Sequence, residues 1–155
     1  MSLIRLVTWL LLLGVGLTAC AHRERDFIPA DGDECPRGGI CKVRVEVLTQ
    51  GTGCSVRLGN ARQKNLYMPP GDLDVVIQWH LDRAAEQNYE FRNDSIYLKT
   101  GTTDQFQLAG ALARGKKFMI VNANEKTESF EYNIKVYRKQ GGPCVVLDPF
   151  IHNIN

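Results

Sequence analysis

The sequence predicts an all-β protein, an antiparallel β-sandwich of seven or eight short strands that is stabilised by disulfides. Short segments in which apolar and polar residues alternate recur along the chain, and each alternation indicates a strand with one buried face. Stretches rich in Gly, Pro, Asn and Asp separate these segments, as turns do. The sequence shows no long amphipathic helix and no internal repeat.

Two strands are expected between residues 41 and 58, separated by a turn at residues 49–53. Their core-facing side chains stand at alternate positions and are Val43, Val45, Val47, Val56 and Leu58. Residues 60–70 are expected to form a loop, because they end in two prolines that cannot join a central ladder.

The third strand shows the clearest alternation. Its apolar residues share one face and are Leu73, Val75, Ile77, Trp79 and Leu81. Residues 82–88 are polar and are expected to form one helical turn. The remaining strands are expected over the apolar or alternating runs at residues 89–91, 96–98, 106–108, 116–122 and 130–136, and a break at residues 141–143 precedes the apolar residues 144–147. Residues 109–115 are compatible with either a short helix or a loop.

Residues 1–19 have the composition of a secretory signal. Arg5 supplies positive charge, an apolar stretch follows it, and small residues precede Cys20. The apolar stretch is shorter than the roughly 20 residues that span a bilayer. Leu17-Thr-Ala-Cys20 resembles the lipobox of bacterial lipoproteins. That resemblance implies cleavage before Cys20, a diacylglycerol thioether on its sulfur, and acylation with a fatty acid such as palmitate at the new amino terminus. An ordinary signal peptide cut before a cysteine is the alternative.

The resemblance also bears on location. In enteric lipoproteins an Asp after the modified cysteine causes retention in the inner membrane, whereas this chain has Ala21. The expected place is therefore the periplasmic face of the outer membrane, with the inner membrane as the alternative. Acylated Cys20 makes the lipid bilayer an expected partner.

The chain divides into three parts. Residues 1–19 are the signal, residues 20–34 are expected to be a flexible acylated tether, and residues 35–155 are expected to form a single β-sandwich domain. Removing the signal takes the lysine-plus-arginine count from 19 to 18, against 17 acidic residues, which leaves a charge near +1. This balance disfavours nucleic acid as a partner, since such proteins carry a clustered basic charge.

Four cysteines follow Cys20, and an even number in an exported domain favours disulfides. They are Cys35, Cys41, Cys54 and Cys144. We favour the pairing of Cys35 with Cys41 and of Cys54 with Cys144. The pairing of Cys41 with Cys54 competes, because both share the inward phase of their strands. A zinc site is disfavoured, since no two cysteines have C-x2-C spacing.

Several stretches carry a resemblance over about half of the chain: Ile77-Gln-Trp79, Tyr89-Glu-Phe91, Ile96, Tyr132 and Leu147-Asp-Pro-Phe-Ile-His-Asn153. They resemble a group of small uncharacterised bacterial proteins with a cupredoxin-like β-sandwich that lacks the metal. The resemblance implies a fold and no activity. An immunoglobulin-like arrangement is equally compatible with the strand pattern.

We expect no metal and no cofactor. A copper centre of the cupredoxin kind needs two histidines, a thiolate and usually a methionine. No methionine follows His152, and a disulfide would remove the thiolate of Cys144. His22 lies in the expected tether and His80 on the polar side of its strand, so both are expected to be solvated or hydrogen-bonded.

Two long loops, at residues 60–70 and 109–117, are candidate contact surfaces for an acidic partner such as peptidoglycan carboxylates, lipopolysaccharide phosphates or a protein. Their candidate residues are Arg62, Lys64, Tyr67, Arg114 and Lys116. The closing residues 148–153 have two interpretations. In the favoured one Asp148 caps a turn and Phe150 packs at an edge, and in the other Asp148, His152 and Asn153 form a binding site.

The sequence does not indicate an enzyme. It contains no G-x-S-x-G elbow, no H-E-x-x-H and no Gly-rich phosphate loop, so no catalytic residue is assigned. We therefore expect a non-enzymatic, membrane-anchored envelope lipoprotein that binds another envelope component, such as a protein or peptidoglycan, or has a structural role. A periplasmic inhibitor or immunity protein against a cell-wall hydrolase is one alternative, and a metal-handling protein is another.

Overall fold

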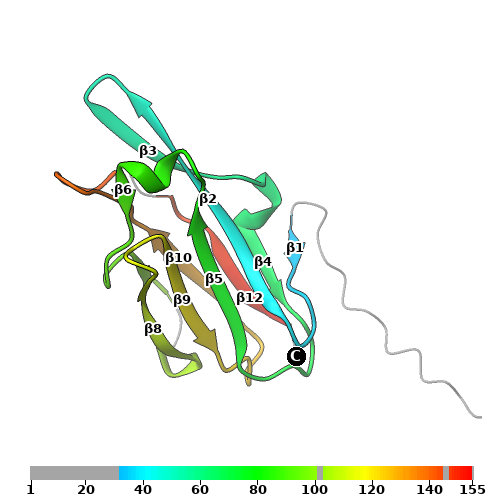
Figure 1. The fold of residues 1–155 in the computed structure, drawn as a ribbon. Coiled ribbons are helices and arrows are strands. Elements are labelled where there is room, and N and C mark those ends of the chain that lie inside the picture. The colour runs from blue at the N-terminus through cyan, green and yellow to red at the C-terminus, as the bar shows by residue number, and fades with distance from the viewer. Residues whose placement is uncertain (1–31, 101–102, 145–146, 155) are drawn as a thin grey trace, which may run out of the picture.

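The computed structural model describes residues 32–100, 103–144 and 147–154. They form an all-β domain in which two five-stranded sheets pack face to face, with a two-stranded sheet beside them (Figure 1). The expected signal, Cys20 and most of the expected tether lie outside the described residues. Within the described part of the chain no helix is long and apolar enough to cross a membrane.

The first sheet has the order β1-β4-β12-β10-β7, and the second has the order β3-β2-β5-β9-β8. The first consists of β1 (Asp33–Glu34), β4 (Asn65–Met68), β12 (Phe150–Asn153), β10 (Glu128–Ile134) and β7 (Ile96–Leu98). The second consists of β3 (Gly53–Leu58), β2 (Ile40–Gln50), β5 (Val75–Leu81), β9 (Lys117–Asn122) and β8 (Phe106–Leu112). The small sheet pairs β11 (Tyr137–Arg138) with β6 (Tyr89–Glu90). Three 3-10 turns, η1 (Ala61–Lys64), η2 (Ala85–Gln87) and η3 (Thr103–Gln105), connect strands.

The core fills the space between the two large sheets. Trp79 of β5 and Tyr132 of β10 are fully buried, and their ring centroids lie 5.4 Å apart at 64°. The indole Nε1 of Trp79 donates a hydrogen bond to the Tyr132 hydroxyl at 3.3 Å. Burial raises the pKa of Tyr132, so this hydroxyl stays protonated. The pair joins the sheets by apolar contact and satisfies both buried polar groups.

A buried polar pair crosses the same core. Asn122 of β9 donates from Nδ2 to Oδ1 of Asn153 in β12 at 2.7 Å, and Asn153 donates back at 3.3 Å. Both residues are almost fully buried. Because each amide satisfies the other, the pair links the sheets without an unpaired polar atom between them.

Two disulfides also join the sheets, in the pairing favoured from the sequence. Cys35, which follows β1 of the first sheet, is bonded to Cys41 in β2 of the second. Cys54 in β3 of the second sheet is bonded to Cys144, whose backbone N–H donates to the carbonyl of Val136 just after β10. The four half-cystines are buried. The first disulfide therefore links the sheets near β1 and β2, and the second links them near β10 and β3.

The strand alternation predicted from the sequence is confirmed for the long strands. In β2 and β5 the side chains of Val43, Val45, Ile77 and Trp79 are buried, whereas the residues between them are partly or fully exposed. Leu73 is an exception, since 63% of it is exposed. Asp74 adopts a left-handed φ of 53°, which breaks the alternation just before β5 and turns Leu73 away from the core.

The predicted all-β, disulfide-stabilised fold is confirmed, but the sandwich is not antiparallel as predicted, because both large sheets are mixed. β2 pairs with β5 in parallel, and so does β4 with both β12 and β1. Alternation reports which side chains are buried and carries no information on strand direction. Parallel neighbours also need a long connection, so no local turn signals them.

The structure has twelve strands within its described residues, more than the seven or eight expected. The strands missed are β1, β4, β11 and β12, each of two to four residues. Such lengths are too short for a clear period of two. The β1 pairing with Leu66 and Tyr67 also places the end of the expected tether, at Asp33 and Glu34, inside the domain.

Both predicted contact loops are corrected as well. Residues 60–70 hold η1 and β4, and Leu66, Tyr67 and Met68 of β4 are buried. In the second loop β8 extends to Leu112, so only residues 113–116 form the turn before β9. Of the apolar residues 144–147, residues 145–146 lie outside the described ones, and Leu147 forms an isolated antiparallel bridge with Ile134.

Candidate binding surface

The second sheet has an outer face that is directed away from the core. Successive side chains of each strand point alternately to the core and to this outer face. In β2 the outward positions alternate with the buried valines and are Ile40, Lys42, Arg44, Glu46 and Leu48. Strand β2 runs through the middle of the view in Figure 1, from the edge near β4 to the long hairpin with β3. Its outward row is therefore charged at the centre and apolar at both ends.

Neighbouring strands align further cations with this row. In the register of the sheet Arg44 lies beside His80 of β5, and His80 lies beside Lys117 of β9. On the other side Glu46 pairs with Arg57 of β3. We call the outward side chains of Lys42, Arg44, Arg57, His80 and Lys117 the basic face. These residues are far apart in the sequence, and the sheet register brings them together.

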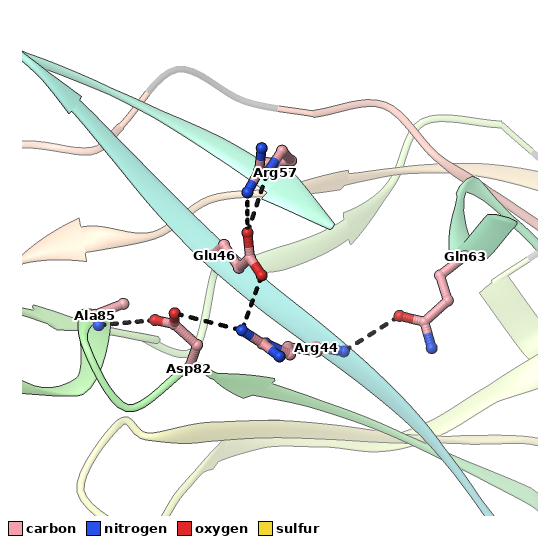
Figure 2. Close-up of polar contacts among 6 residues, drawn as sticks. All are labelled: Arg44, Glu46, Arg57, Gln63, Asp82 and Ala85. Atoms are coloured by element: carbon pink, nitrogen blue, oxygen red, sulfur yellow. Dashed lines mark hydrogen bonds and ion pairs between the residues drawn. The ribbon is translucent and has the colours of Figure 1, made fainter. Parts of the chain in front are cut away.

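Two carboxylates contact the arginines of this face, namely Glu46 and also Asp82, whose Oδ2 lies 3.9 Å from Nη2 of Arg44 (Figure 2). Glu46 accepts from Nε of Arg57 at 3.1 Å and forms an ion pair with Nη2 of Arg44 at 3.0 Å (Figure 2). The hydrogen bond from Arg57, with the charges of Arg57 and Arg44, holds the pKa of Glu46 below its usual range against the opposing effect of burial. Glu46 is therefore ionised at neutral pH and offsets part of the charge of two arginines.

The two lysines of the basic face have no such partner. Within the described part of the chain, no carboxylate lies in ion-pair distance of Lys42 or Lys117. Both side chains are exposed. Their charges are thus available to a ligand.

His80 lies between these cations. Burial, followed by the charges of Lys117, Lys42 and Arg44, lowers the pKa of His80, and Glu86 acts weakly in the other direction. The imidazole is therefore neutral at pH 7 and takes a proton only when an anion approaches or the pH falls. Beside it the surface is hollowed between Arg44, His80, Asp82 and Arg83.

Gln63 fixes η1 against this face. Its Oε1 accepts from the backbone N–H of Arg44 at 3.3 Å, and its Nε2 donates to the carbonyl of Lys42 at 2.9 Å (Figure 2 shows the first). The side-chain amide of Gln63 thus bonds to the backbone of β2 at residues that no longer pair with β3, because that pairing ends at Val45. As a result the predicted contact residues Arg62 and Lys64, both exposed, flank the Lys42 end of the basic face.

The predicted residues Arg114 and Lys116 lie at the opposite edge, in the turn between β8 and β9. Lys116 pairs with Glu86 at 2.8 Å, which leaves it largely neutralised. Arg114 is exposed and adopts a left-handed φ of 58°. The carbonyl of Lys116 accepts from Leu81 at the end of β5, so this turn adjoins the His80 end of the basic face.

The other predicted residues lie on the outer face of the first sheet. Tyr67 was expected in an exposed loop, but it is buried, with its ring stacked on that of His152 at 4.6 Å. His152 shares a hydrogen bond with the hydroxyl of Ser129 through Nδ1 at 2.8 Å and one with Oδ1 of Asn65 through Nε2 at 3.2 Å. Both residues are thus held within the strands β4, β12 and β10.

The two interpretations of residues 148–153 can be compared with this geometry. Asp148 accepts from Nδ2 of Asn133 and lies 3.4 Å from Nζ of Lys99. Asn153 faces the core, whereas Asp148 and His152 are on the outer face, so the three do not form one site. The structure places the segment in a strand that lies between β4 and β10, and not at a sheet edge as the favoured interpretation had it.

We call this outer face of the first sheet the paired face, because its lysines have acidic partners. Lys99 pairs with Glu131 at 2.6 Å and with Asp148, and Lys135 pairs with Asp94 at 3.5 Å. Its exposed large apolar side chains are aromatic, Tyr97 and Phe150. Lys135 also lies 4.6 Å from the centre of the Tyr97 ring.

Sequence reasoning missed Lys42, Arg44, Arg57 and Lys117, and left His80 as a solvated residue. The available signal was the alternation itself, which marked Lys42 and Arg44 as outward. What was missing was the pairing of β2 with β5 and of β5 with β9. Without those neighbours the cations belong to separate strands.

No known protein family and no curated protein matches this chain in sequence. Within the described residues, no group of three or more His, Cys, Asp and Glu side chains is placed to hold a metal ion.

Proposed function

We propose that this chain is an exported, lipid-anchored envelope protein that acts by binding an acidic envelope component through its basic face. The observation that carries the proposal is the contrast in charge pairing. Lys42 and Lys117 are exposed without a carboxylate in ion-pair distance, whereas Lys99 and Lys135 of the paired face lie against carboxylates. Neighbouring unpaired cations repel one another and so lower the stability of the folded chain. An anionic ligand bound to this face would offset that repulsion, which gives these cations a function.

Export is supported by two independent features. The leader ending in Leu17-Thr-Ala-Cys20 resembles that of bacterial lipoproteins. The domain also contains two disulfides, which form and persist in oxidising compartments such as the periplasm. We place the anchor in the outer membrane, on its periplasmic face, because Ala21 and not Asp follows Cys20.

The proposed role is non-enzymatic, because the basic face is an open sheet surface. Such a surface offers contact area and charge complementarity, which determine encounter rate and specificity. Peptidoglycan carboxylates, lipopolysaccharide phosphates and other anionic lipids all fit this charge.

The anchor is tested with the full chain in a Gram-negative bacterium fed radiolabelled palmitate. We expect label in the wild-type chain and in the outer-membrane fraction, and no label in Cys20→Ser. An unlabelled, unprocessed chain that is found reduced inside the cell would contradict the proposal.

The basic face is tested by co-sedimentation of the purified chain with isolated sacculi, with lipopolysaccharide and with anionic vesicles, at low and high salt. We expect binding to at least one of the three, lost in Lys42→Gln/Lys117→Gln and retained in the matched control Lys99→Gln/Lys135→Gln. Equal binding by both variants would exclude the basic face as the contact surface.

A second candidate, an inhibitor or immunity protein against a cell-wall hydrolase, is favoured by a different feature. The hairpin of β2 and β3 extends beyond the rest of the sandwich (Figure 1), and the disulfide from Cys54 braces it close to its tip. A rigid projecting hairpin suits insertion into an enzyme cleft. Inhibition of a purified hydrolase that disappears when residues 50–53 are replaced by a shorter turn supports this role, and unchanged lysis counts against it.

A further inference from the structure

The basic face carries aliphatic side chains as well as cations. Ile40, Leu48 and Leu112 point outward from the second sheet and are 45%, 37% and 40% exposed. The paired face instead exposes the aromatic residues Tyr97 and Phe150. These five and Leu73 are all the large apolar residues of the described chain that are exposed. The aliphatic members on the sheets are therefore confined to one face.

These three residues surround the cations. Ile40 and Leu48 are eight positions apart in β2, which corresponds to about 27 Å of strand. Leu112 lies in β8, three strands across from β2, which corresponds to roughly 14 Å. Arg44, His80 and Lys117 form the transverse row that leads from β2 to Leu112. The face thus presents charge at its centre and isolated aliphatic chains at its periphery.

This combination matches the boundary of a membrane. Anionic headgroups attract Lys and Arg, while aliphatic side chains enter the acyl boundary just beneath them. A saccharide carboxylate would use the cations but leave the aliphatic side chains in water. The apolar part of the face therefore favours lipid among the acidic components.

We propose that the basic face docks on the anionic lipid surface of the membrane that holds the anchor, with Lys42, Arg44 and Lys117 against headgroup phosphates and Ile40, Leu48 and Leu112 inserted between headgroups. This inference rests on the proposed function, and it specifies the ligand of the same face. It goes beyond attachment through Cys20, since it gives the domain a fixed orientation on the bilayer.

Because the chain between the anchor and the domain is short, even weak docking is enough to orient the domain on the membrane. Gly32, the first described residue, is twelve residues after Cys20, which allows a separation of at most about 40 Å. A domain held that close meets the lipid surface at a high effective concentration. Modest attraction by two or three cations then orients most of the molecules.

The test measures which face approaches the lipid. The full chain is reconstituted through its own anchor into vesicles of phosphatidylcholine alone or mixed equally with phosphatidylglycerol, both containing a brominated quencher lipid. A bimane label is attached at Leu112→Cys on the basic face or, as the matched control, at Tyr97→Cys on the paired face. Both positions are exposed and belong to strands of the two large sheets.

We expect quenching of the label at position 112 in the anionic vesicles only, and no quenching at position 97 in either. Lys42→Gln/Lys117→Gln should lower the ratio of docked to undocked molecules about thirtyfold, the equivalent of about 2 kcal/mol for two basic residues near an anionic surface. High salt should have the same effect.

Equal quenching of the two labels, or quenching at position 112 that ignores lipid charge, would overturn the inference. The sacculus arm separates it from the proposed function. Lysine-dependent binding to sacculi or free lipopolysaccharide, with no quenching, refutes lipid docking and leaves the binding role intact. If neither quenching nor lysine-dependent binding occurs, both proposals fall.

Discussion

The two outer faces of the sandwich both carry charged residues, but they differ in whether their lysines are paired with carboxylates. On the paired face, Lys99 and Lys135 lie against Glu131, Asp148 and Asp94, and the charges are satisfied within the domain. On the basic face, Lys42 and Lys117 stand exposed around a neutral His80. The pairing of charges, more than their number, therefore distinguishes the two surfaces. The charges of the paired face are neutralised within the domain, whereas the lysine charges of the basic face are available to an anionic ligand.

The core that holds both faces in place gives the largest expected effect. Trp79→Ala removes a fully buried ring that joins β5 to β10 and leaves the Tyr132 hydroxyl without its donor. We expect a loss of about 3–5 kcal/mol in the free energy of unfolding, measured by urea denaturation. Binding of anionic ligands through the basic face should weaken together with the loss of stability. A loss below 1 kcal/mol, the size of a small packing change, would show that the sheets are joined in some other way.

The next effect comes from Glu46, the carboxylate that both Arg44 of β2 and Arg57 of β3 contact. Glu46→Gln removes the negative charge that Arg44 and Arg57 share, and it leaves Arg44 only the longer ion pair with Asp82 at 3.9 Å. Since each added positive charge near an anionic surface contributes about 1 kcal/mol, binding to anionic vesicles should strengthen roughly fivefold. Vesicle co-sedimentation measures it, and Glu131→Gln on the paired face is the control that should leave binding unchanged. Weaker binding in Glu46→Gln would mean that the arginines need Glu46 to hold their position.

The pH dependence of the basic face follows from His80. Its pKa is below the usual 6.5, because of burial and the charges of Lys117 and Lys42. The folded protein thus binds this proton less readily than the unfolded chain, and stability should fall as the pH decreases from above 6.5 through the lowered pKa. An anionic lipid surface near His80 raises the pKa of the imidazole and favours its protonated form. Acidification should therefore strengthen docking, by a few-fold at most.

Both effects are measured as differences between wild type and His80→Gln, which cancels the titration of other groups. The charged groups around the imidazole are Lys117 on β9, Lys42 and Arg44 on β2, and Glu86 in η2. Identical pH profiles for the two proteins, in urea denaturation and in docking, would remove His80 from the basic face.

The smallest expected effect is a difference in stability between two single-lysine variants. Lys99→Gln leaves Glu131 and Asp148 without their shared cation, so stability should decrease slightly. Lys117→Gln removes a charge that Glu86 attracts only from beyond ion-pair distance and that nearby cations repel, so stability should stay nearly unchanged. Parallel urea titrations of the two variants decide this, and a clear loss for Lys117→Gln would reveal an internal partner.

The sequence predicted those features that depend on local pattern. Buried positions such as Val43 and Ile77 follow from alternation, and the turn before β3 follows from its glycines. The strand β4 was taken for a loop because two prolines follow it, although its three apolar residues are buried. Pairing with β12 and β1 stabilises this short strand, and no local signal reports that pairing.

The candidate surface depended even more on long-range pairing. Arg44, His80 and Lys117 stand on β2, β5 and β9, separated by more than thirty residues at each step. Only the register of the sheet places them in one row. Arg62 and Lys64 could be selected from the sequence as exposed cations, but their place beside Lys42 depends on the side chain of Gln63.

Lysine labelling in intact membranes tests the contrast between the two faces most directly, because it needs no substitution. The rates of amine acetylation at Lys42 and Lys117 are compared by mass spectrometry with those at Lys99 and Lys135, first in isolated membranes and then after transfer to detergent in high salt. We expect Lys42 and Lys117 to be protected in membranes and to react quickly after transfer, with Lys99 and Lys135 unchanged. If Lys42 and Lys117 react as quickly in membranes as in detergent, the basic face is unoccupied and the account is wrong.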